Sequence, residues 1–163
     1  MDRLLLHFGF DALVGILVGV FAFALWKGDV AERAGGGMNL AAGLFAMFLQ
    51  PLLQRSAQPT ALLLVDGALA AGFLFLALRY ASLWLGGALL LQAVQFSLHA
   101  YYIVGASRPD FNHSLGFKVV NNLDTTGINI CIFLGTIMAW RRRARAAKAG
   151  PAVSSSAPRA SLS

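Results

Sequence analysis

Residues 60–104 decide the fold class: TALLLVDGALAAGFLFLALRY is followed, after Ala81, by SLWLGGALLLQAVQFSLHAYYIV. Each half holds about 20 mostly apolar residues, the number that an α-helix needs to cross a hydrocarbon layer of about 30 Å. The turn around Arg79, Tyr80 and Ala81 is so short that the two helices must run antiparallel. This stretch therefore predicts a membrane-spanning helical hairpin.

The composition of the whole chain agrees with a membrane protein. Of its 163 residues, 58% are hydrophobic and only 12% are charged, with a mean hydropathy of +0.67. Soluble domains are about 25% charged. The net charge of +6 does not indicate nucleic-acid binding, because much of it comes from one basic block that follows an apolar segment. We therefore expect a single all-α bundle in the lipid bilayer, with no nucleic-acid partner.

Five segments are candidate spans: 4–26, 38–53, 60–78, 82–104 and 117–140. The segment 38–53 is the weakest, because it is short and ends at Gln50 and Pro51. Glycines 35–37 are expected to form a flexible link before it, with Asn39 as a helix cap. If this segment does not cross, four spans remain and both termini lie inside. Residues 1–148 would form the bundle, and the Ala/Ser/Pro-rich residues 149–163 a disordered tail.

The basic residues predict the orientation. With five spans and the carboxyl terminus in the cytoplasm, nine of the 13 Lys and Arg residues fall inside: Lys27, Arg33, Arg79, Arg141, Arg142, Arg143, Arg145, Lys148 and Arg159. This places the amino terminus outside, since cytoplasmic loops are enriched in Lys and Arg. Trp26, Trp84 and Trp140 then fall at cytoplasmic span ends, where indoles settle at the membrane interface. A bacterial inner membrane is the expected host.

Three aspartates lie inside the apolar segments. Asp11, Asp66 and Asp124 each lie about six residues from the outer end of a span, which is about 10 Å deep at 1.5 Å per residue. A carboxylate in hydrocarbon is costly, so it faces a protein interior, a water-filled cavity or a partner charge. The shared depth predicts a polar pocket that opens to the outside and is closed toward the cytoplasm.

Further polar residues fall at the same depth. Gln92, Gln95, His99 and Tyr102 follow one another at helical steps of three or four residues. Span 117–140 carries Asn121 and Asp124 on one stripe, with Asn122 beside it. The candidate solute- or ion-binding residues are therefore Asp11, Asp66, Asp124, His99, Gln95, Asn121 and Asn122. The alternative for Gln92, Gln95, Asn129 and the threonines is simple bonding between helices, at about 0.6 kcal/mol per bond.

Three classes of function fit this pattern. The first is a small transporter that binds a proton plus a cation or amine at the pocket, working as a homo-oligomer because the chain is short. The second is an accessory subunit of a larger membrane complex, with the Gly15/Gly19 pair as a contact surface for another helix. The third is a haem or metal protein, with His7 and His99 as ligands.

Enzymatic motifs do not occur in the chain. There is no phosphate-binding loop, no GxSxG elbow, no HExxH pair and no CxxC or CxxCH sequence. Cys131 is the single cysteine, so no disulfide can form within the chain and no thiol pair can bind a metal. An enzyme is therefore the least favoured class, and no cofactor is predicted.

Overall fold

Five helices make up the described part of the chain. The computed structural model describes residues 2–54, 57–104 and 115–149, with side chains for residues 14–49, 51–54, 57–58, 60–101, 103–104 and 119–148. The helices are α1 (Asp2–Lys27), α2 (Val30–Leu52), α3 (Gln58–Tyr80), α4 (Leu83–Val104) and α5 (Leu115–Ala149). No strand occurs among these residues, so the all-α prediction is confirmed for them.

Three of the helices are long and apolar enough to cross a membrane. By length and composition these are Thr60–Tyr80 in α3, Leu83–Tyr101 in α4 and Val119–Lys148 in α5. The part of α1 whose side chains are described, Val14–Lys27, is apolar but shorter. These three segments agree with a helical bundle that is embedded in a membrane.

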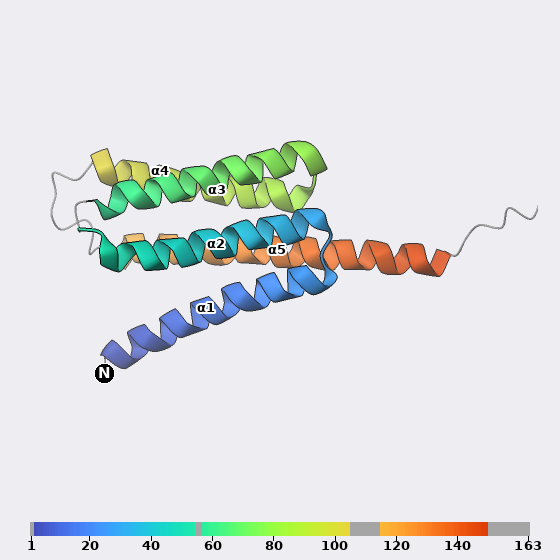
Figure 1. Cartoon of the computed structure of the whole chain (residues 1–163), viewed down its shortest axis with the longest axis horizontal. Coiled ribbons are helices and arrows are strands. Elements are labelled where there is room, and N and C mark those ends of the chain that lie inside the picture. Colours follow the sequence, from blue (N-terminus) through green and yellow to red (C-terminus); the bar gives the residue numbers. More distant parts are fainter. Residues whose placement is uncertain (1, 55–56, 105–114, 150–163) are drawn as a thin grey trace, which may run out of the picture.

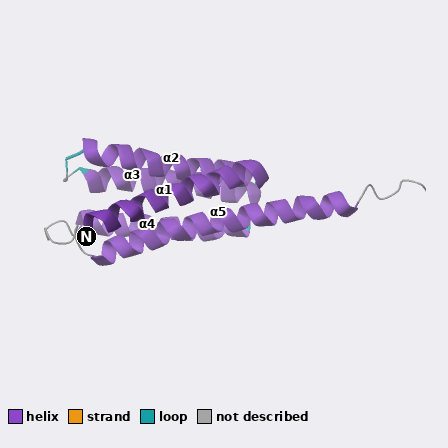
Figure 2. Ribbon diagram, turned by 90° about the horizontal axis from the view of Figure 1, so that it is seen from below, coloured by secondary structure: helices purple, strands orange, loops and turns teal. Residues whose placement is uncertain are grey.

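The helices form a closed ring. Each helix packs against the next one along the chain, from α1 to α5, and contacts between α5 and α1 close the ring. In addition, α2 contacts α5 across the centre. The α1–α2 and α3–α4 turns lie at the same end of the bundle, which we call the turn end (Figure 1). At this end α5 continues beyond the other helices, whereas α1 diverges from them toward its amino end (Figures 1 and 2). The opposite end is called the open end below.

The start of α2 differs from the sequence-based prediction. The helix begins at Val30, where the Glu32 carboxylate accepts a hydrogen bond from the Asp29 backbone N–H (3.0 Å), as in a capping box. Residues 35–37 therefore lie within the helix, and the predicted flexible link is wrong. Asn39 is not a helix cap either, because it lies buried inside α2.

The glycines of α2 allow neighbouring helices to approach closely. A Cβ atom on Gly35 would lie 2.8 Å from Cη2 of Trp84, and one on Gly36 would lie 3.3 Å from Cδ2 of Phe21. The contact at Gly35 is too short for a real Cβ atom, and the one at Gly36 is tight enough that Phe21 would have to shift. The run of glycines is thus explained by packing against α1 and α4, and the flexibility of glycine is not required.

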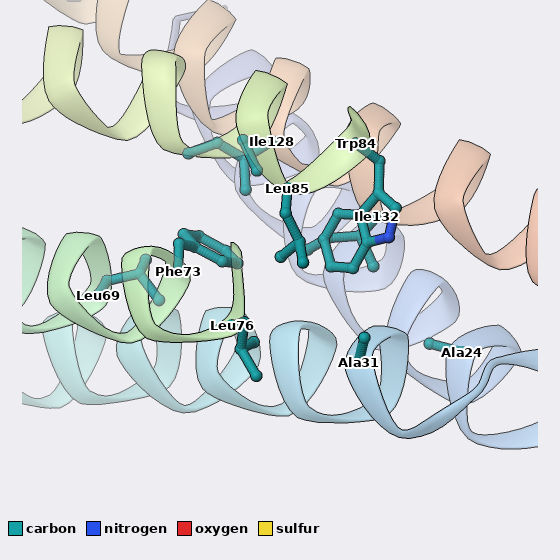
Figure 3. Close-up of a cluster of buried hydrophobic side chains, with 10 residues drawn as sticks. Ala24, Ala31, Leu69, Phe73, Leu76, Trp84, Leu85, Ile128 and Ile132 are labelled. Atoms are coloured by element: carbon teal, nitrogen blue, oxygen red, sulfur yellow. The ribbon is translucent and has the colours of Figure 1, made fainter. Parts of the chain in front are cut away.

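The apolar core extends from the middle of the bundle toward the turn end. Phe73, Leu85, Ile128 and Ile132 are fully buried there and come from α3, α4 and α5 (Figure 3). Trp84 belongs to the same cluster, with only 4% of its surface exposed. Its prediction as an interfacial indole is wrong, because the ring points into the bundle and its N–H finds an acceptor there. Trp26 and Trp140 are exposed as expected for interfacial residues.

The basic block at residues 141–148 lies within α5. The span expected over residues 117–140 lies within α5, and the helix continues beyond it to Ala149. On this extension, Nε of Arg143 lies 3.2 Å from Oδ1 of Asp29, and its Nη2 donates to the carbonyl oxygen of Lys27. The extension is therefore tied to the α1–α2 turn. The predicted disordered tail, apart from residue 149, lies outside the described residues.

Candidate polar site

A buried Asp–His contact joins α3 to α4. Asp66 Oδ2 contacts His99 Nδ1, and both side chains are almost inaccessible to solvent. Gln92 lies two turns from His99 on the same face of α4. Its Nε2 donates to Asp66 Oδ1 (3.3 Å) and to the Asp66 carbonyl oxygen (3.4 Å). Because a carboxylate oxygen and an unprotonated ring nitrogen offer only lone pairs, the Asp–His contact requires a proton on one of the two atoms. The contact therefore pairs two ionisable side chains inside the bundle.

A second polar contact joins α4 to α5. Gln95 Nε2 donates to Asn121 Oδ1 at 3.2 Å, and both residues are half-buried. These two predicted site residues are thus brought together. Asn122 is exposed on the neighbouring face of α5, where its backbone carbonyl accepts the Thr126 hydroxyl. The structure thus places Asn122 apart from the buried polar groups.

Asp124 is buried on α5, with 6% of its surface exposed. Its Oδ2 atom has no hydrogen-bond donor among the described residues. No contact between Asp124 and Asp66 is recorded, so the two carboxyl groups are not shown to share one cavity. The common pocket of the three aspartates stays a prediction, and the side chains of Asp11 and His7 lie outside the described residues.

A third polar contact lies on the other side of α5. Asn39 Nδ2 on α2 donates to Asn129 Oδ1 at 3.1 Å, and Asn129 Nδ2 donates to the Thr125 carbonyl oxygen at 2.9 Å. Both asparagines are buried. This pair bridges two helices without an ionisable group, which is the structural role that the sequence suggested for Asn129.

Sequence reasoning missed one buried carboxylate, that of Glu32. Only 1% of its surface is exposed, and Oε1 accepts the indole N–H of Trp84 at 2.9 Å. The sequence reading left Glu32 in the connection between segments 4–26 and 38–53, whereas the structure places it in the first turn of α2 and inside the bundle. The available signal was the Asp29-x-x-Glu32 spacing, which marks the start of a helix.

Metal ligation is not supported by the described residues. No three His, Cys, Asp or Glu side chains come together in the ranges whose side chains are described. The pairing of His7 with His99 around a haem cannot be examined, because His7 lies outside those ranges. The metal and haem hypotheses therefore stay predictions without added support.

A groove of about 730 Å³ runs between α2 and α3, and its walls are apolar. Met38 and Phe45 of α2 face Leu64 and Gly72 of α3 across it. The polar residues described above do not line this groove. It is therefore separate from the candidate polar site.

Comparison of the chain with protein-family models, with curated proteins and with solved structures gives no match.

Proposed function

We propose that the chain is a five-span membrane protein that binds a proton together with a small cation or amine in its polar site, and that it transports this solute as a homo-oligomer. The contact that carries the proposal is Asp66–His99, with Gln92 holding the carboxylate from its other side. Ionisable groups at this depth in a membrane bundle are functional by default, because their burial is costly and serves no packing purpose.

The number of spans rests on helix length. α1 has 26 residues and α2 has 23, which correspond to about 39 Å and 35 Å at 1.5 Å per residue. Both exceed the hydrocarbon thickness of about 30 Å. With Glu32 and Arg33 in the first turn of α2, its remaining turns are free of charged residues up to Leu52. Five spans are therefore compatible with the lengths of all five helices.

The orientation follows from the charges at the turn end. Lys27, Arg33 and Arg79 lie there, together with the basic extension of α5. We assign the turn end to the cytoplasm, because basic residues accumulate on that side. The open end, nearer to Asp66 and His99, then faces outward. The host would be a bacterial inner membrane.

The test is proton movement in liposomes that contain the purified chain. A gradient of Na⁺ or of methylammonium, directed outward, is imposed on the vesicles. A pH-sensitive dye inside them then reports the movement of protons. We expect the wild-type chain to acidify or alkalinise the lumen faster than empty vesicles, and Asp66→Asn and His99→Gln to abolish the difference. Asn129→Ala is the matched control, since it removes a buried polar contact but no ionisable group. Equal rates for wild type and Asp66→Asn would refute the proposal.

An accessory subunit is the second candidate, favoured by one observation on α1. A Cβ atom added at Gly15 or Gly19 would meet nothing within 4 Å, so no described helix covers this face. Small residues at a spacing of four are typical of helix contacts in membranes. If this candidate holds, gentle purification yields a fixed partner chain that is lost on Gly15→Leu. A lone oligomer of this chain would contradict it.

A further inference from the structure

Three buried side-chain oxygens have no hydrogen-bond donor among the described residues. Oδ2 of Asp66 contacts His99, and the other two are Oδ2 of Asp124 and Oε1 of Gln92, in the middle of the bundle. Gln92 is fully buried and Asp124 is 6% exposed. The orientation of the Gln92 amide is fixed by its surroundings, because its Nε2 faces two oxygens of Asp66. Turning the amide over would place oxygen against oxygen. Oδ2 of Asp124 and Oε1 of Gln92 are therefore both acceptors, and their missing partner is a donor or a cation.

The register between α4 and α5 places these two side chains at the same level. Gln95 donates to Asn121, and a Cβ on Gly127 would lie 2.7 Å from Cδ1 of Leu91. These two contacts lie on either side of Gln92 along α4 and of Asp124 along α5. Residues three apart share a helix face, so Gln92 and Asp124 both lie one turn deeper than the Gln95–Asn121 hydrogen bond, on the same faces.

Among the described side chains, no Lys or Arg lies near the carboxyl group of Asp124 to neutralise it. Every Lys and Arg whose side chain is described lies in the first or last turn of a helix or on the α5 extension. The imidazole of His99 contacts Asp66. Among the described side chains, the buried titratable groups on the packed helices are the imidazole of His99 and the carboxyls of Asp66, Asp124 and Glu32, and Glu32 accepts the Trp84 N–H near the turn end. An isolated carboxylate is too costly in such surroundings. A proton or a bound cation must supply the neutralising charge.

We propose that Asp124 and Gln92 hold one exchangeable cation, which is a proton in one state and a small alkali cation in the other. In the proton-loaded state, the Asp124 hydroxyl donates to Oε1 of Gln92. When the alkali cation binds, the O–H bond of Asp124 breaks, the proton leaves to water, and the cation contacts both oxygens. Carboxylate and amide oxygens are the ligands that hard cations prefer. This inference rests on the proposed function and names the residues that couple the two ions.

The experiment measures proton release from the full-length chain in detergent. LiCl, NaCl or KCl is added to weakly buffered protein with a pH dye, and choline chloride at equal concentration controls for ionic strength. We expect about one proton released per chain with at least one alkali cation and none with choline.

Asp124→Asn should release no proton. The new amide N–H can still donate to Gln92 and so maintain the fold. Gln92→Met should require about tenfold more cation, since one ligand of a charged group is lost. Ile130→Ala, an exposed change on the same helix, should match wild type.

Absence of cation-specific proton release from the wild-type chain would overturn the inference, as would equal release from Asp124→Asn. Either result can be told apart from failure of the proposed function. If liposomes still show Asp66-dependent proton movement, only the Asp124–Gln92 site is refuted. If proton release follows Asp124 but liposomes show no transport, the cation site stands and the transporter proposal is refuted.

Discussion

Replacing Gly135 by alanine should destabilise the bundle, because the space for a methyl group is already filled by Trp84. A Cβ atom there would lie 2.6 Å from both Cδ1 and Cγ of the indole and 2.8 Å from Cδ2. The ring cannot move aside. Its N–H is bonded to Glu32, and its far edge lies against Gly35.

The expected cost can be bounded from two opposing terms. Inserting a methyl group into a well-packed core costs about 1–3 kcal/mol. Alanine is a better helix former than glycine by about 1 kcal/mol, which offsets part of the strain. The two terms leave a net loss of up to about 2 kcal/mol in the free energy of unfolding for Gly135→Ala. Gly15→Ala and Gly19→Ala are the matched controls, since no atom lies within 4 Å of either Cβ position. They should leave stability unchanged or raise it by up to about 1 kcal/mol.

Thermal unfolding of the purified chain in detergent, followed by circular dichroism and by size exclusion after heating, measures these differences. A shift of about 2–4 °C per kcal/mol is expected for a chain of this size. A second background isolates the cause: Gly135→Ala should cost less when introduced into Trp84→Phe than into the wild-type chain, because the smaller ring relieves the overlap. If Gly135→Ala unfolds at the same temperature as Gly15→Ala, the packing of α4 against α5 described here is refuted.

Two further changes test other parts of the bundle. Asn39→Ala and Asn129→Ala should each lower the free energy of unfolding by about 0.6 kcal/mol. The double variant should lose less than the sum of the two, because both changes remove one shared hydrogen bond, and additive losses in the same unfolding assay would contradict that pairing. Ala81→Gly should raise the midpoint by an amount that corresponds to about 1 kcal/mol, since Ala81 caps α3 with a left-handed φ of 46° that only glycine adopts without cost; an unchanged or lower midpoint would speak against this cap geometry.

Much of the fold follows from apolar segment length, which is a local property of the sequence. The hairpin of α3 and α4 was predictable because two long apolar segments leave only a tight turn between them. The start of α2 was not, because glycine within a helix is unfavourable in water and residues 35–37 resemble a link. Their helical conformation depends on Phe21 and Trp84, which approach from other helices. Tertiary packing of this kind leaves no trace in a single segment.

The candidate site shows the same division. Helical spacing placed Gln95, His99 and Asn121 on buried or half-buried faces, and the structure joins Gln95 to Asn121 and His99 to Asp66. Spacing along one helix cannot decide which partner a side chain meets on another. For this reason the sequence suggested that Gln92 bridges helices, as it does, but could not name Asp66 as its partner, and the burial of Glu32 against Trp84 was missed. Both depend on the rotation of one helix relative to its neighbour.

The closure of the ring by α5 has a consequence for biogenesis. Arg143 meets the α1–α2 turn across 116 residues of chain, and Asn129 satisfies Asn39 across 90. A ribosome delivers the amino-terminal helices first, so Asn39 has no α5 partner until synthesis is nearly complete. Polar groups left without partners in lipid are costly. Chains interrupted before residue 115 should therefore be recognised by membrane quality-control proteases, and supplying α5 as a separate segment should protect them.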